Sequence, residues 1–112
     1  MDVDVYSQYF AASCVYNGRE RKAVAVKLTS SSEAGMIRYC VSVSFFPHEN
    51  LEDFAISYDA YEEKEIYNAK GRRSKKREDG MLAEIRSHAD ELGKELGGTI
   101  DWNMPLGEAR RG

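Results

Sequence analysis

Proline, cysteine, histidine and long apolar runs are all scarce in this chain. Its 112 residues include two prolines, two cysteines, two histidines and one tryptophan. No apolar stretch approaches the roughly 20 residues that a bilayer-spanning helix needs, so we expect no membrane association. The acidic start, Met1–Val5, lacks the basic and apolar regions of a secretory signal. We therefore expect a cytoplasmic protein.

The few cysteines and histidines also bear on chemistry. Cys14 and Cys40 fall in predicted strands without metal-ligand spacing, and we expect two reduced, mostly buried thiols. His48 and His88 lie 40 positions apart, and neither belongs to a ligand motif. Glycine-rich phosphate loops and nucleophile elbows are also missing. The sequence thus predicts no enzyme, no metal and no cofactor.

The pattern of apolar residues predicts an α+β fold, with a meander-like antiparallel sheet of four to five strands packed by one C-terminal helix. Asn17-Gly18 favours a type I′ turn between the first two strands. Alternation puts Val24, Val26 and Leu28 on one side of the second strand. The polar segment 30–35 is expected to connect the second and third strands. The predicted strands are Val3–Tyr16, Lys22–Thr29, Met36–Phe46, Asp53–Tyr61 and a short Thr99–Trp102, with Glu62–Asn68 more ambiguous but favouring extended structure.

One helix is predicted over residues 79–96, because five apolar side chains recur at spacings of three and four residues. They are Leu82, Ile85, Ala89, Leu92 and Leu96. We expect this stripe to cover the sheet, since its two heptads are too few for a convincing coiled coil. Gly97-Gly98 ends the helix. A domain over residues 1–102 and a mobile tail over 103–112 complete the expected organisation.

The start of this helix has two candidates, Ser74 and Asp79. A cap at Ser74 would put Lys75, Lys76 and Arg77 in the first turn. Cations there oppose the helix dipole, at about 0.3–1 kcal/mol each. We therefore expect Asp79 to be the cap, with the basic residues in a preceding loop.

Charge changes sign abruptly in the second half of the chain. Residues 49–65 carry seven carboxylates and one base, Lys64, and residues 70–77 carry six positive charges. Like charges packed so closely repel unless something neutralises them. The net charge of −3 confines any attraction for nucleic acid to a local patch.

The first functional hypothesis is a small non-enzymatic accessory protein that binds nucleic acid or a nucleoprotein complex. Arginine forks and lysine ammonium groups both bind phosphate. Tyr58, Tyr61 and Tyr67 could stack unpaired bases, although strand propensity also explains them. The opposing reading is a solvated run neutralised by residues 49–65. The proposed contact residues are Lys70, Arg72, Arg73, Lys75, Lys76 and Arg77.

The alternative is a protein-interaction or inhibitor module whose acidic strand occupies the basic groove of a nucleic-acid-handling partner. Spaced carboxylates can imitate a phosphate backbone. The residues proposed for this contact are Asp59, Glu62, Glu63 and Glu65. For the chain itself we expect a monomer or a helix-paired homodimer.

Overall fold

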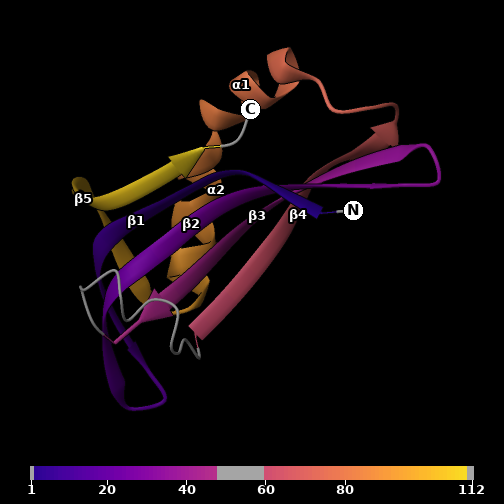
Figure 1. Ribbon diagram of the computed structural model, residues 1–112. Helices are drawn as coiled ribbons and strands as arrows, with labels where there is room; N and C mark the ends of the chain where they lie inside the picture. The colour runs from indigo at the N-terminus through magenta and orange to yellow at the C-terminus, as the bar shows by residue number, and fades with distance from the viewer. Residues whose placement is uncertain (1, 48–59, 111–112) are drawn as a thin grey trace.

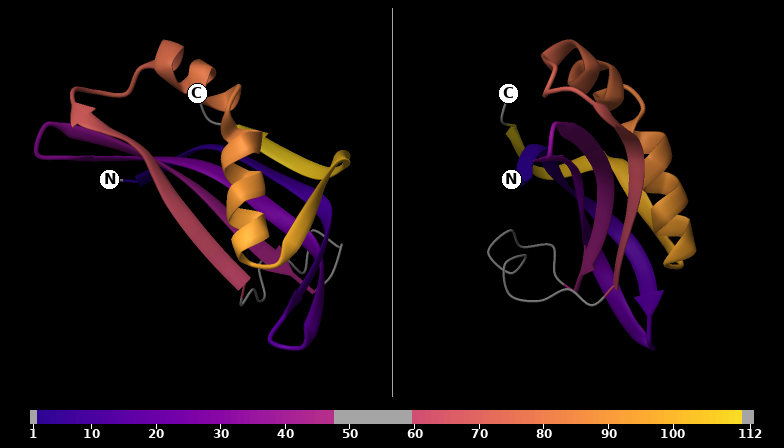
Figure 2. Two further views of the ribbon diagram at one scale, coloured as in Figure 1. Left: turned by 180° about the vertical axis from the view of Figure 1, so that it is seen from behind. Right: turned by 90° about the vertical axis from the view of Figure 1, so that its right-hand side faces the viewer.

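Five antiparallel strands form one sheet, and two short helices lie on one of its faces (Figures 1 and 2). The computed structural model describes residues 2–47 and 60–110. The strand order is β4-β3-β2-β1-β5, so the first four strands form a meander and the chain then crosses the sheet to pair β5 with β1. The α+β prediction is confirmed. The elements are β1 (Asp2–Tyr16), β2 (Arg19–Glu33), β3 (Met36–Phe46), β4 (Ala60–Lys70), α1 (Lys75–Leu82), α2 (Ile85–Glu95) and β5 (Gly98–Arg110).

The first two hairpins of the meander each close through two residues with positive φ. Asn17 and Gly18 (φ 53° and 75°) join β1 to β2, as the sequence predicts. Ala34 and Gly35 (φ 53° and 77°) join β2 to β3. The expected connector over residues 30–35 is therefore only two residues long. Its serines belong to β2, where they pair with β3 as far as Glu33 opposite Met36.

The core lies between the sheet and α2. Residues that point to this side, here called the helix face, include Val24, Val26 and Leu28, as their alternation predicts. From α2, Ile85, Ala89 and Leu92 pack against them, and Leu82 and Leu96 are partly buried at the margins. The apolar stripe thus covers the sheet. The β3 residues in this core are Ile37, Tyr39, Val41, Val43 and Phe45.

The opposite side of the sheet is called here the second face. Ala23, Ala25 and Phe46 form a smaller buried cluster on it. Cross-strand partners share a face, so the register also assigns polar residues of β3 and β4 to this side. Among them, Arg38 pairs with both Ser31 and Asn68. This face is therefore more polar than the helix face.

The helical segment begins earlier than expected and is divided. Lys75 starts α1 and Ile85 starts α2, with a break at Ala83 and Glu84. The prediction of a single helix over 79–96 is wrong on both points. Within the described ranges, neither helix is long and apolar enough to cross a membrane.

The last strand is also longer than expected. Residues 103–110, predicted as a mobile tail, continue β5 and pair with the first half of β1 through Tyr6↔Arg110. Without β5 the 15-residue β1 would be a long, unpaired edge. At the other edge, Glu62–Asn68 is extended within β4, as favoured. Most of the strand predicted at Asp53–Tyr61 falls outside the described residues; Ala60 and Tyr61 belong to β4.

Candidate functional site

The basic run begins on the sheet and ends inside α1. Lys70 closes β4 opposite Met36, and the backbone N–H of Gly71 donates to the Gly35 carbonyl at 3.0 Å. Ser74 then caps α1 with extended backbone, and its hydroxyl accepts from the Arg77 N–H at 3.3 Å. Placement of the whole run in a loop is therefore wrong. Its second half, from Lys75 to Arg77, forms the first helical turn.

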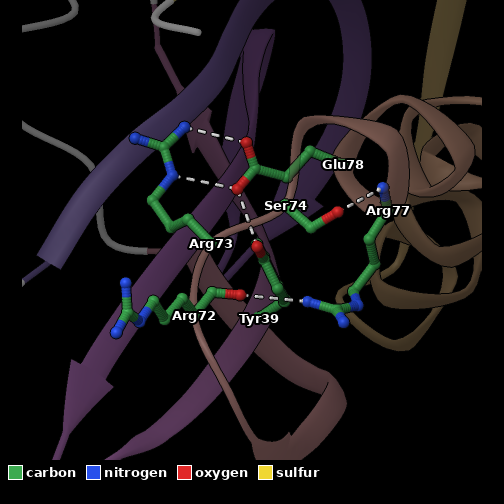
Figure 3. Close-up of polar contacts among 6 residues, drawn as sticks. All are labelled: Tyr39, Arg72, Arg73, Ser74, Arg77 and Glu78. Carbon is green, nitrogen blue, oxygen red and sulfur yellow. Dashed lines mark hydrogen bonds and ion pairs between the residues drawn. The ribbon is translucent and has the colours of Figure 1, made fainter.

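A buried carboxylate explains why α1 starts at this point. Glu78 is 4% exposed, and Arg73 donates to both of its oxygens, from Nε at 2.9 Å and Nη2 at 2.8 Å (Figure 3). The hydroxyl of Tyr39 donates to the same carboxylate at 2.7 Å. These bonds, led by those from Arg73, hold the pKa of Glu78 below its ordinary value although burial acts to raise it. The start at Ser74 therefore places Glu78 in its buried, fully bonded position.

Arg77 is also directed toward its own molecule. Its guanidinium lies over the Tyr67 ring, 4.6 Å from the centroid. Arg77 Nη1 also donates to the Arg72 carbonyl at 3.2 Å (Figure 3). The Tyr67 ring meets the Tyr39 ring edge to face, with centroids 5.8 Å apart. We call Tyr39, Tyr67, Arg73, Arg77 and Glu78 the anchoring network. It fixes the linker and α1 to β3 and β4.

Four cations of the run remain outside this network: Lys70, Arg72, Lys75 and Lys76. All four are exposed. Across the described residues, none of their side chains forms an ion pair or a hydrogen bond. The first-turn lysines add their charge to the positive end of the α1 dipole. We call these four residues the cationic ridge.

The acidic segment does not neutralise the ridge within the described part of the chain. The single base of the acidic segment, Lys64, forms an ion pair with Glu91 of α2 at 3.0 Å. Arg73 of the basic run forms its ion pair with Glu78, which lies outside the acidic segment. Neutralisation of the basic run by residues 49–65 was one interpretation of the sequence, but no carboxylate of residues 60–65 forms an ion pair with that run. Residues 49–59 fall outside the described residues.

The carboxylates proposed for the alternative contact divide between two faces of the edge strand β4. Glu62 is opposite Val43 on the helix face, whereas Glu63 and Glu65 are opposite Ser42 and Cys40 on the second face. Burial, and then the charge of Glu63, raise the pKa of the Cys40 thiol. Asp59 falls outside the described residues.

The tyrosines proposed for base stacking have partners of their own. Tyr67 lies beneath Arg77, and Tyr61 donates to Glu63 at 2.6 Å. Tyr58 is outside the described residues. Sequence reasoning missed the roles of Tyr39 and Glu78. The sequence did contain a sign of the role of Glu78, because an acidic residue in the first turn after a serine is typical of a helix start at that serine.

Comparison with known proteins gives no relative: no family model, no curated protein and no solved structure matches this chain. Among the described residues, no group of three or more histidines, cysteines or acids could hold a metal ion. The cationic ridge is therefore the candidate site, and it rests on geometry and charge alone.

Proposed function

We propose that this protein binds nucleic acid, alone or in a nucleoprotein complex, through the cationic ridge. The observation that supports this is the exposure of Lys70, Arg72, Lys75 and Lys76 without carboxylate partners in the described structure. We assign a positioning role to Arg73 and Arg77, which were proposed from the sequence as direct contacts, because both side chains have partners within the anchoring network. No catalytic role is proposed.

Phosphate is the group that this ridge suits best. Arg72 can offer a planar fork to phosphate oxygens, and the lysines add point charges that release counterions. Lys75 and Lys76 also sit at the N-terminus of α1, where backbone N–H groups and the dipole favour an anion. Because the net charge is −3, attraction for nucleic acid has to come from a local patch such as this ridge. Four phosphate contacts would give a log–log slope of affinity against salt of about −3 on a single strand and about −4 on a duplex.

The test compares two double variants that remove equal charge. Lys75→Ala with Lys76→Ala removes half of the ridge, whereas Arg19→Ala with Lys22→Ala removes two exposed cations beside the β1–β2 turn. That turn and the β2–β3 turn next to the ridge lie at opposite ends of β2. We expect only the ridge variant to lose affinity for a labelled oligonucleotide and to show a shallower salt slope. Equal affinities for both variants, with both folded by circular dichroism, would contradict the proposal.

A second candidate function uses the acidic edge. Glu63 and Glu65 are exposed on one face of β4, which is an edge strand among the described residues, and they could meet the basic groove of a nucleic-acid-handling protein. Charged residues also protect edge strands from aggregation, which explains them without any partner. In a pull-down after nuclease treatment, a protein partner that the native protein still captures should be lost from the double variant Glu63→Lys with Glu65→Lys. Persistence of that partner in the variant would rule this second function out.

A further inference from the structure

A cavity lies on the second face beside the cationic ridge. Its volume is about 370 Å³, and it sits between the β2–β3 hairpin and the end of β4. The lining residues are Ser31, Glu33, Ala34, Met36, Arg38 and Asn68. We call it the hairpin pocket.

The register joins this pocket directly to the ridge. Met36 is paired with Lys70, so both side chains lie on the second face and the first ridge cation stands at the rim. The Gly71–Gly35 backbone bond then ties the start of the linker to the turn of the hairpin. A nucleic-acid strand with a phosphate at Lys70 would therefore pass the mouth of the pocket.

The lining has the chemistry of a site for a flat, polar heterocycle. Met36 is 37% exposed and offers a polarisable thioether, which makes favourable contacts with aromatic rings. Arg38 offers a planar guanidinium, and Asn68 offers both a donor and an acceptor. Glu33 disfavours phosphate in the pocket but can accept a hydrogen bond from an exocyclic amine. Charge thus separates a phosphate-binding ridge from a pocket that suits a base.

Resting on the proposed function, we propose that the hairpin pocket receives one unpaired base of a single strand bound along the ridge. Single strands expose their bases for such capture, whereas a duplex keeps them stacked and paired. Because Glu33 accepts from an amine, the pocket favours amine-bearing cytosine over thymine. The ridge supplies affinity and the pocket supplies preference for single strands and for base type.

The first experiment measures the affinity of Met36→Ala for single-stranded and duplex DNA of matched length. We expect single-strand affinity to fall about fivefold, as for loss of one sulfur–aromatic contact, with duplex affinity unchanged. Met104→Ala is the matched control, because Met104 is 54% exposed on β5 and lies outside the pocket. Equal effects of Met36→Ala on both forms, or no effect on either, would overturn the pocket assignment.

The second experiment measures the ratio of affinities for oligo(dC) and oligo(dT) in Glu33→Ala. The ratio should exceed one in the native protein and fall to about one in the variant. Glu20→Ala, which removes an exposed acid near the β1–β2 turn, should leave the ratio unchanged. If Glu33→Ala raises both affinities at a constant ratio, the pocket proposal fails while the ridge proposal stands. If the native protein binds neither oligonucleotide, both proposals fail.

Discussion

Arg73 and Glu78 form a two-bonded ion pair across the Ser74 cap of α1. Glu78 is buried, and its carboxylate accepts a third bond from Tyr39, which is wholly buried in the sheet. The pair therefore joins the linker to the helix on one side and to β3 on the other. In this way it positions the cationic ridge, although none of the four ridge side chains takes part in the pair.

Replacement of Arg73 by alanine should destabilise the fold. Glu78 would remain buried with one of its partners lost, which costs of order 1–3 kcal/mol. Urea denaturation measures the change in free energy of unfolding. Lys64→Ala, which removes the exposed pair with Glu91, is the control and should change the stability less. A larger loss from Lys64→Ala would contradict the anchoring role of Arg73.

Acidification should remove the contribution of Glu78. Because Arg73 and Tyr39 lower its pKa in the folded state, the unfolded chain binds the proton first as the pH falls. The stabilisation is therefore complete above the ordinary pKa of 4.5 and is lost as the pH falls through the lower folded value. The difference in unfolding free energy between the native protein and Glu78→Gln should shrink along this range. A difference that stays constant with pH would show that the carboxylate charge does not stabilise the fold.

Charge reversal in the first turn of α1 should stabilise the protein and weaken the proposed binding of nucleic acid. Lys75 and Lys76 oppose the helix dipole, so replacing both by glutamate should gain about 0.5–2 kcal/mol. Thermal unfolding gives the stability, and oligonucleotide titration gives the affinity. Lys94→Glu is the control of opposite sign, because Lys94 lies in the last turn of α2, where a cation is favourable. A loss of stability in the first variant would contradict this account of α1.

Two glycines next to Phe45 should respond differently to alanine. A Cβ at Gly98 would lie 2.5 Å from the Phe45 ring and 3.0 Å from Cys14 Cβ, and both side chains are buried. Gly98→Ala should therefore cost about 1–3 kcal/mol. At Gly93 the nearest atom would be 3.6 Å away, so Gly93→Ala should be tolerated and gain up to about 1 kcal/mol in helix propensity. Similar unfolding midpoints for the two variants would show that the Phe45 ring can move aside without loss of stability.

Local patterns succeeded where neighbouring residues carry the signal. Alternation along β2 and β3 predicted which side chains enter the core, and Asn17-Gly18 predicted the first turn. The stripe that includes Ile85, Ala89 and Leu92 predicted the helix surface that covers the sheet. In each case burial of apolar surface follows the period of the backbone, which can be read within a few residues.

The start of α1 could not be predicted from neighbouring residues: the cap is Ser74 and not Asp79. The helix dipole costs about 0.3–1 kcal/mol at each of Lys75, Lys76 and Arg77. The three bonds that Glu78 accepts from Arg73 and Tyr39, at about 1.5–3 kcal/mol each to a charged group, outweigh this cost. Tyr39 is 39 residues away in the chain, so no local window includes it. Likewise, residues 103–110 extend β5 by pairing with β1, which lies about 100 positions earlier in the chain (Tyr6↔Arg110).

Local sequence patterns were enough to predict the antiparallel strands, the apolar helix surface and the concentration of positive charge before the last strand. The packing of the described elements settles which cations of the basic run have no side-chain partner among the described residues. It turned Arg73 and Arg77 toward Glu78 and Tyr67, and left Lys70, Arg72, Lys75 and Lys76 exposed. The reason is physical: burial of a carboxylate requires bonded partners, and their positions depend on how distant segments pack.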